Sequence, residues 1–328
     1  MTGVKLLLDF VNQAAERPVF LVGAERSGST LLRLMLSHHP QLAFHFESGF
    51  VVQPFLAGHE EPTGGQLRNY QDWLRISTAF KASGFAIDES LPYRELVRSF
   101  LRQKAVLTGK PFTGMTIHHG FEHLPKIWPD ARYIYLLRDG RDVSHSMMRM
   151  GWYGNAWAAT ERWKQAIASY DKLTSLVPAK NLIKVRFENL ASDSQAELMR
   201  ISNFIGIPYD DAFFDYAKTS SYSLPGQKKA ANWRDHMDQH AIRLVEAEIG
   251  GLLQRFGYEL SGLDHIEITA KLREQLMREN TRLRRKWRIN RYGFWNIAFN
   301  KIADKLSLAT LKEATHSRMS KISRDHLK

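Results

Sequence analysis

The residues with the clearest capacity for chemistry form the run Gly23-Ala24-Glu25-Arg26-Ser27-Gly28-Ser29-Thr30. Its spacing, G-x-x-x-x-G-S-T, is that of a Walker-type P-loop, except that Ser29 stands where an ATP-binding loop carries lysine. Glycines let the backbone approach an anion, and the N–H groups that begin the next helix point at it with the positive end of the helix dipole. The missing lysine removes the charge that reaches the β- and γ-phosphates of a nucleoside triphosphate, while Arg26 supplies a charge inside the loop. We therefore expect this loop to bind a phosphate that is not part of Mg-ATP.

A second group of anion-binding residues follows the apolar run 133–137. Arg138 offers a planar donor fork that matches phosphate geometry. Ser146 lies eight residues later, on a helix that we predict over residues 143–150, where its hydroxyl adds a donor. Considered alone, the segment Arg138–Asp142 is equally compatible with a turn of solvated charges. Its pairing with the first loop favours a second phosphate site.

Strands and helices alternate along the chain, and both groups of polar residues follow predicted strands. Apolar runs predict buried strands at residues 19–22, 42–46, 112–117, 133–137 and 182–187. Periodic patterns predict helices at residues 30–38, 93–104, 143–150, 155–177, 196–205 and 238–256. This alternation predicts an α/β, P-loop-type three-layer fold with a central parallel sheet, in which ligands bind at the carboxyl ends of the strands. The remaining segments favour a leading helix at 1–18, an exposed loop at 62–65 and a polar loop at 219–233.

Length and composition restrict the class of protein. A chain of 328 residues with 44% hydrophobic content is typical of a folded globular protein. It has no cysteine, which excludes disulfides, thiolate metal sites and cysteine nucleophiles. We find neither a secretory signal nor an apolar run of about 18 residues, so we expect a cytoplasmic location. The H-x3-H spacing of His119 and His123 lacks a third ligand nearby, and we expect no metal site.

The positive charge of the chain is concentrated at its C-terminal end. From Lys271 onward there are 16 Lys and Arg against 5 Asp and Glu, whereas residues 1–270 carry a net charge of only +1. We therefore predict a domain over residues 1–262 and a basic, mostly helical extension over residues 263–328. The extension has two amphipathic stretches, whose apolar residues are Leu272, Leu276, Leu283 and Trp287, then Trp295, Ala298, Phe299, Ile302 and Leu306. Such helices lie on an anionic membrane, bind an acidic partner, or pack on the domain or a second subunit with their charges in solvent.

The loop and the second motif together resemble those of a known family. Gly23–Leu36 is similar to the 5′-phosphosulfate loop of the sulfotransferases, and Tyr135–Ser146 to their 3′-phosphate motif. The resemblance spans roughly residues 18–260 and includes W-P-D-A-R before the second motif and V-R-F-E-N-L after it. The tyrosylprotein and bacterial branches are more similar than the cytosolic aryl branch, because of R-S-G-S-T and R-D-G-R. The resemblance implies that 3′-phosphoadenosine 5′-phosphosulfate (PAPS) is the donor and that no Mg²⁺ is needed.

The resemblance also implies roles for individual residues. Five consecutive residues would cradle the 5′-phosphate and the sulfate bridge: Arg26, Ser27, Gly28, Ser29 and Thr30. Arg138 and Ser146 would hold the 3′-phosphate. Residues 220–229 resemble the loop that covers the donor in this family, which makes Lys228 or Lys229 a phosphate contact.

Two residues are candidates for the base that takes the proton of the acceptor hydroxyl. Glu47 ends the run 42–46 and lies 21 residues after Arg26, a spacing similar to that of the glutamate base in the tyrosylprotein branch. His118 ends the run 112–117, where the cytosolic branch carries its histidine base, and its ordinary pKa suits the task. We favour Glu47 and keep His118 as the alternative.

The sequence departs from the family at two places. Met115 and Thr116 occupy the region where many members carry a lysine, and Lys110 reaches that place only through a register shift. The group that stabilises the leaving oxygen is therefore unassigned. Phe187 stands where relatives often carry tyrosine, which removes one hydroxyl from the adenosine side.

These features predict an enzyme that transfers sulfate from PAPS to a hydroxyl acceptor, and they leave the acceptor open among a small phenol, a sugar, a lipid and a peptide tyrosine. One alternative is a P-loop kinase-like phosphotransferase, which Ser29 disfavours. Another is a non-catalytic nucleotide- or nucleic-acid-binding protein that uses the basic extension. A genome-binding protein would spread its charge over its folded face, so we expect no specific nucleic-acid partner.

Overall fold

The structure, a computed structural model, describes residues 16–226 and 232–305, together with Thr315, residues 318–319 and Ile322. It divides into two compact units. The first takes the chain up to Arg138 and residues 162–231, and the second takes residues 139–161 and the chain from Asn232 onward. Most of the predicted leading helix lies outside the described residues, as do Lys228, Lys229 and Leu306. The predicted boundary at residue 262 stays a prediction.

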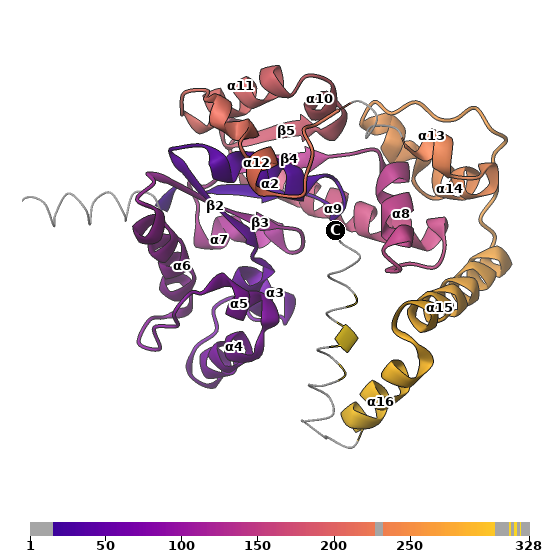
Figure 1. Ribbon diagram of the computed structural model, residues 1–328, viewed down its shortest axis with the longest axis horizontal. Helices are drawn as coiled ribbons and strands as arrows, with labels where there is room; N and C mark the ends of the chain where they lie inside the picture. The colour runs from indigo at the N-terminus through magenta and orange to yellow at the C-terminus, as the bar shows by residue number, and fades with distance from the viewer. Residues whose placement is uncertain (1–15, 227–231, 306–314, 316–317, 320–321, 323–328) are drawn as a thin grey trace, which may run out of the picture. The chain divides into compact units, whose positions relative to one another are not determined.

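The first unit is built on a five-stranded sheet (Figure 1). Its strands are β1 (Val19–Val22), β2 (Leu42–Glu47), β3 (Phe112–Ile117), β4 (Arg132–Leu137) and β5 (Leu182–Arg186). All neighbours pair in parallel, in the order β2-β3-β1-β4-β5. The predicted central parallel sheet is confirmed. β1 lies in its middle, so the chain after β1 has a strand end on either side.

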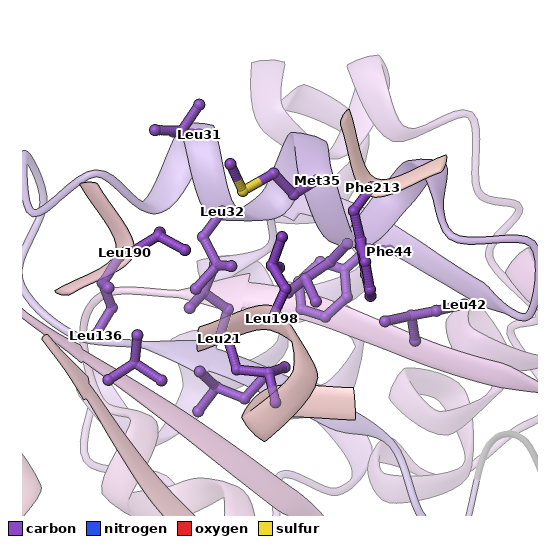
Figure 2. Close-up of a cluster of buried hydrophobic side chains, with 14 of the residues drawn as sticks. Leu21, Leu31, Leu32, Met35, Leu42, Phe44, Leu136, Leu190, Leu198 and Phe213 are labelled. Carbon is purple, nitrogen blue, oxygen red and sulfur yellow. The ribbon is translucent and has the colours of Figure 1, made fainter. Parts of the chain in front are cut away.

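Both faces of the sheet are covered, which explains why its strands read as continuous apolar runs. On one face, Leu21 of β1 and Leu136 of β4 pack with Leu32 of α2 (Ser29–His38), Leu190 and Leu198 in the cluster that Figure 2 shows. On the other face, the ring of Phe20 lies 5.1 Å from that of Trp128 and 5.8 Å from that of Tyr133. Tyr135 of β4 also stacks at 4.1 Å on Tyr170 of α9 (Ala156–Leu176), so helices form a layer on each side of the sheet, as the three-layer prediction requires.

The helices of this unit include those predicted at residues 30–38, 93–104, 155–177 and 196–205, and others that were not predicted. They are α2 (Ser29–His38), α3 (Gln53–Leu56), α4 (Gly64–Ile76), α5 (Thr78–Ser83), α6 (Tyr93–Thr108), α7 (Leu124–Ile127), α10 (Phe187–Ser192), α11 (Ser194–Ile205) and α12 (Tyr216–Thr219), with α9 (Ala156–Leu176) contributing residues to both units. Short 3₁₀ turns occur at Gly49–Val52, Phe121–His123, Ala179–Asn181 and Asp211–Phe214. Two predictions need correction: Gly64 begins a helix rather than lying in a loop, and Phe187 begins α10 rather than ending β5.

The second unit is helical. It contains α8 (Gly140–Arg149), α13 (Trp233–His236), α14 (Gln239–Arg255), α15 (Ala270–Tyr292) and α16 (Phe294–Lys305). The helical character predicted for the basic extension is therefore confirmed over residues 270–305. Within the described residues, no helix combines the length and the apolar character needed to cross a membrane.

Candidate functional site

The register of the sheet brings the predicted site residues to one edge. Val22 of β1 pairs with Ile117 of β3 on one side and with Tyr135 of β4 on the other. The residues that follow these strands therefore gather around the loop after β1. His118 follows β3 directly, and Arg138 follows β4 directly.

The loop after β1 needs glycine at both of its ends. A Cβ at Gly23, where φ is 140°, would lie 2.4 Å from the carbonyl oxygen of Leu136. A Cβ at Gly28, where φ is 95°, would lie 2.3 Å from the ring of Phe187. Between them Arg26 adopts φ of 67°, the one positive φ of a non-glycine residue among those described. Strain at this position is typical of a ligand-binding loop.

The loop ends as a helix N-terminus that can bind an anion. Gly28 is the N-cap of α2, so no capping side chain accepts from the first N–H groups of the helix. The first turn of α2, which the structure describes in full, carries no acidic residue. Ser27 is almost fully buried, and its Oγ has no hydrogen-bond partner among the described residues. Ser29 and Thr30 form the first turn of the helix. These donors fit a phosphate or sulfate group.

His118 is hydrogen-bonded to this loop. Its Nδ1 donates to the carbonyl of Gly23 at 2.8 Å, so its Nε2 faces the Oγ of Ser29 at 3.4 Å and the Oε1 of Glu47 at 3.6 Å. Burial disfavours the charged imidazolium, yet the hydrogen bond and charge of Glu47, with the Gly23 carbonyl and Glu25, outweigh it and raise the pKa of His118. The structure thus brings both predicted base candidates together.

Glu47 owes its position to an irregularity in the sheet. His45 pairs with Met115 of β3 and Glu47 pairs with the next residue, Thr116, so Phe46 is the extra residue of a bulge. The side chain of Glu47 is 67% exposed, whereas that of His118 is 6% exposed. The hydrogen bond and positive charge of His118 lower the pKa of Glu47 against the opposing effect of burial. Glu47 is therefore an ionised carboxylate that solvent or an acceptor can reach.

A second histidine–carboxylate pair lies beside the first, and the sequence did not reveal it. His119 Nε2 donates to Glu25 Oε1 at 2.6 Å, and Arg162 Nη1 lies 3.4 Å from the same nitrogen. Burial raises the pKa of Glu25, but the hydrogen bond of His119 and the charges of both histidines and Arg162 lower it overall. The pair could have been predicted from its position in the chain, because Glu25 follows β1 and His119 follows the neighbouring strand β3.

A further cation, besides His118, acts on the Glu47 carboxylate. Arg33 of α2 is part-buried, and its charge lowers the pKa of Glu47. Burial and the positive charges of Lys104 and Arg33 lower the pKa of His45 to about 3. His45 is therefore neutral at physiological pH. None of these residues was among those predicted for the site.

Arg138 connects the second motif to the loop. Its Nη1 donates to the carbonyl of Arg26 at 3.3 Å, and its guanidinium lies 4.5 Å from the centroid of the Phe187 ring. Its own carbonyl accepts a hydrogen bond from Trp163 Nε1 at 2.9 Å. The Phe187 ring therefore packs against both Gly28 and Arg138. This packing does not need the hydroxyl that a tyrosine would carry at this position.

The rest of the second motif belongs to the second unit and is structural. Asp139 caps α8 by accepting from the N–H of Arg141 at 2.9 Å. The Arg141 guanidinium is buried, with Asp139 at 2.7 Å, Glu246 at 2.6 Å and the Trp233 ring at 3.8 Å. The alternative of a turn with solvated charges is therefore wrong. Ser146 is half-buried on α8, and its predicted phosphate contact stays a prediction.

Lys110 lies at the opposite end of α2 from the loop. Its Nζ donates to the carbonyls of Ser37, His39 and Leu42 at 2.8–3.3 Å, where it completes the C-terminal end of α2. Among the described residues, no cluster of three or more His, Asp or Glu side chains could hold a metal ion.

Comparisons with known proteins agree with this geometry. A model described as the sulfotransferase family matches residues 18–211. Protein-tyrosine sulfotransferase A of Caenorhabditis elegans is 26% identical over 202 residues, which are 59% of this chain and 50% of that protein. Protein-tyrosine sulfotransferase 1 of Danio rerio is 27% identical over 222 residues, 64% of this chain and 59% of the relative. The chain thus spans only about half of the length of these curated relatives.

Two solved structures share the fold. The sulfotransferase domain of the Synechococcus PCC 7002 olefin synthase superimposes with a TM-score of 0.53 at 22% identity, covering 75% of this chain and 97% of that domain. The sulfotransferase domain from the curacin biosynthetic pathway gives 0.51 at 19% identity, covering 74% and 98%. The family model spans more than half of the 328 residues and includes the loop, both base candidates and Arg138. The chain belongs to the sulfotransferase family.

Proposed function

We propose that this protein transfers a sulfuryl group from PAPS to a hydroxyl acceptor. The observation that carries the proposal is the attachment of a histidine–carboxylate pair to a lysine-free anion loop: His118 bonds Gly23 of the loop and faces Glu47. A phosphate-binding loop with a base beside it suits group transfer to a hydroxyl. When bound, PAPS would supply the sulfuryl group and leave as the 3′,5′-bisphosphate, PAP.

The donor would be held by groups from the loop after β1 and from the end of β4. The N–H groups that begin α2, with Arg26, Ser27 and Thr30, would bind the 5′-phosphosulfate end. Arg138, anchored on the Arg26 carbonyl and the Phe187 ring, would bind the 3′-phosphate. Ser146 and Lys228 complete the proposed donor contacts on sequence grounds alone.

Glu47 is the proposed base. An exposed carboxylate can reach an acceptor hydroxyl and take its proton, as the oxygen bonds to sulfur and the bond from sulfur to the bridging oxygen breaks. We assign His118 a positioning and electrostatic role, because its imidazole is buried and both of its nitrogens face groups of the protein. Its raised pKa favours a positive charge beside Ser29. That charge would take the place of the absent lysine in stabilising the leaving oxygen.

A peptide tyrosine is the first acceptor to test. The relatives from Caenorhabditis elegans and Danio rerio are named as protein-tyrosine sulfotransferases. A sugar, a lipid or a small phenol would present the same hydroxyl. Incubating the protein with sulfur-labelled PAPS and each acceptor class, and following the label by mass spectrometry, distinguishes them. Cytoplasmic location stays a prediction, and the basic helices α15 and α16 have no part in this proposal.

Substitution of the pair tests the mechanism. We expect Glu47→Gln to lower turnover by about 10²- to 10⁴-fold, the usual contribution of a general base, with unchanged PAP affinity by calorimetry. His118→Asn should also lower turnover, whereas Glu60→Gln serves as the matched control, since Glu60 is an exposed carboxylate paired with Lys126. A near-normal rate for Glu47→Gln contradicts its role as base. If Mg-ATP rather than PAP raises the melting temperature, the kinase-like alternative replaces the whole proposal.

A further inference from the structure

The second unit carries a basic groove that the transfer chemistry does not use. It lies where α15 and α16 meet and has a volume of about 460 Å³. Four cations line it, Arg284, Arg285, Arg288 and Lys301, together with apolar side chains that include Phe294 and Ile297. A groove of this composition suits a ligand with an anionic end and an apolar end.

The charge of this surface is unbalanced. Residues 281–302 hold seven Lys and Arg and no Asp or Glu. The four cations of the groove make no ion pair with any carboxylate in the described part of the chain, in contrast to Arg278, which pairs with Glu274 one turn earlier on the same helix. A cluster of this kind attracts an anionic surface.

Large apolar side chains accompany the charge on α16. Phe294, Trp295, Phe299 and Ile302 are 54%, 69%, 43% and 46% exposed. The rings of Trp295 and Phe299 stack at 5.9 Å, so they form one continuous aromatic surface. A nucleic acid would neutralise the cations and its bases would stack on the rings, but it offers no hydrocarbon for Ile302. A second copy of the chain would bring the same seven cations against the first.

The start of α15 is anchored, in contrast to this surface. Asn155 Nδ2 donates to the carbonyl of Leu276 at 2.8 Å, and the N–H of Gly154 donates to Asn280 Oδ1 at 2.7 Å. Leu276 is only 4% exposed and packs with Trp157 and Leu244. The apolar stripe of α15 therefore packs within the unit, whereas the stripe of α16 is presented to the surroundings.

The geometry points to a membrane-binding surface: α15 and α16 bind anionic phospholipid. The cations of the groove receive headgroup phosphates, and Phe294, Trp295, Phe299 and Ile302 enter the boundary between headgroups and acyl chains. The mode is that of an interfacial amphipathic helix.

Vesicle sedimentation with the full chain tests this proposal. We expect binding to vesicles of phosphatidylcholine with phosphatidylserine, weakening with salt, and little binding to phosphatidylcholine alone. Arg288→Gln should weaken binding about fivefold, the usual effect of one cation near an anionic surface. Trp295→Ser should weaken it about tenfold or more through lost apolar contact. Thermal unfolding checks that each variant folds.

Lys271→Gln is the matched control. Lys271 is an exposed cation of α15 about 25 Å along the helix from Arg288, beyond the screening length of about 10 Å. It should leave vesicle binding unchanged. Equal losses for Lys271→Gln and Arg288→Gln would overturn the groove as the site, and an unaffected Trp295→Ser would overturn insertion. If inorganic phosphate releases the protein from vesicles more than NaCl of equal ionic strength does, the groove is a site for free phosphate. If the protein binds RNA tightly but not vesicles, its partner is a nucleic acid. Either outcome refutes the proposal.

Discussion

Replacing Gly28 by alanine tests how the anion loop is built. At φ 95° and ψ 14° the backbone is left-handed, which costs an L-residue about 1–2 kcal/mol. The new Cβ would also lie 2.3 Å from Cδ2 and 2.4 Å from Cε2 of Phe187, which is 3% exposed and cannot swing into solvent. Overpacking of this kind costs about 1–3 kcal/mol. We expect Gly28→Ala to lower the free energy of unfolding by about 2–5 kcal/mol.

A double-mutant cycle separates the two contributions. Phe187→Ala removes every side-chain atom that the Cβ would meet but leaves the φ of residue 28 unchanged. In that background Gly28→Ala should cost only the backbone contribution, so the coupling energy should be about 1–3 kcal/mol. Urea unfolding of the wild type, both single variants and the double variant measures it. PAP affinity by calorimetry should fall in Gly28→Ala, because the first N–H groups of α2 move with the loop.

Additive effects would refute the packing argument. If the double variant loses the sum of the two single losses, Phe187 does not restrain Gly28, and the left-handed φ alone explains the glycine. If Gly28→Ala is as stable as the wild type, the conformation of the loop itself is wrong. Gly58→Ala is a suitable control, because its φ of 83° carries the backbone cost while its Cβ meets no atom within 4 Å.

Three further predictions follow from named contacts. Arg138→Lys should weaken PAP binding about ten- to hundredfold by calorimetry, because the fork that bonds the Arg26 carbonyl and stacks on Phe187 is lost; unchanged affinity would remove Arg138 from the donor site. Because the pKa of His118 is raised in the folded protein, its contribution to stability is full below pH 6.5 and is lost as pH rises through the folded pKa. Because the pKa of Glu47 is lowered, its contribution is full above pH 4.5 and is lost as pH falls through the folded pKa. The pair should therefore contribute most between these values, and Glu47→Gln should lower the pKa of His118 in an NMR titration; an unmoved pKa would show that the two groups do not interact. Lys110→Met should lower the free energy of unfolding by about 2 kcal/mol, because its Nζ donates to the carbonyl groups at the C-terminal end of α2. Turnover per folded molecule should be unchanged. A large loss of turnover would instead indicate that Lys110 is the cation that stabilises the leaving oxygen.

The sequence predicted most of the sheet, because each central strand is apolar on both faces. Phe20 packs toward Trp128 while its neighbour Leu21 packs toward α2, so alternation is absent and the run itself is the pattern. Helix α4 was missed because its first residues are Gly64 and Gly65, which by themselves favour a turn. Its half-buried position against the rest of the unit, rather than local propensity, stabilises it as helix.

The candidate site was predictable where residues follow strands and not where packing decides. Arg138 and His118 come directly after β4 and β3, so topology alone brings them beside the loop. The bulge at Phe46, which places Glu47 opposite Thr116, has no sequence signature. The roles of Asp139 and Arg141 depend on Glu246, more than a hundred residues away, so no local pattern could distinguish a buried network from a solvated turn.

The absence of lysine from the loop has a structural counterpart in the strands on either side of it. In an ATP-binding loop one lysine brings its charge along the loop itself, whereas here the neighbouring strand ends deliver cations from two directions. β3 supplies His118, whose raised pKa depends on Glu47, and β4 supplies Arg138, whose position depends on Phe187. The charge on the β3 side is thereby coupled to the protonation state of the proposed base, whereas a lysine would remain charged throughout. A proton taken by Glu47 weakens its hold on the imidazolium, so base and cation respond to each other within one turnover. This coupling requires β1 to lie between β3 and β4, and it makes the strand order, as well as the motif, part of the proposed chemistry.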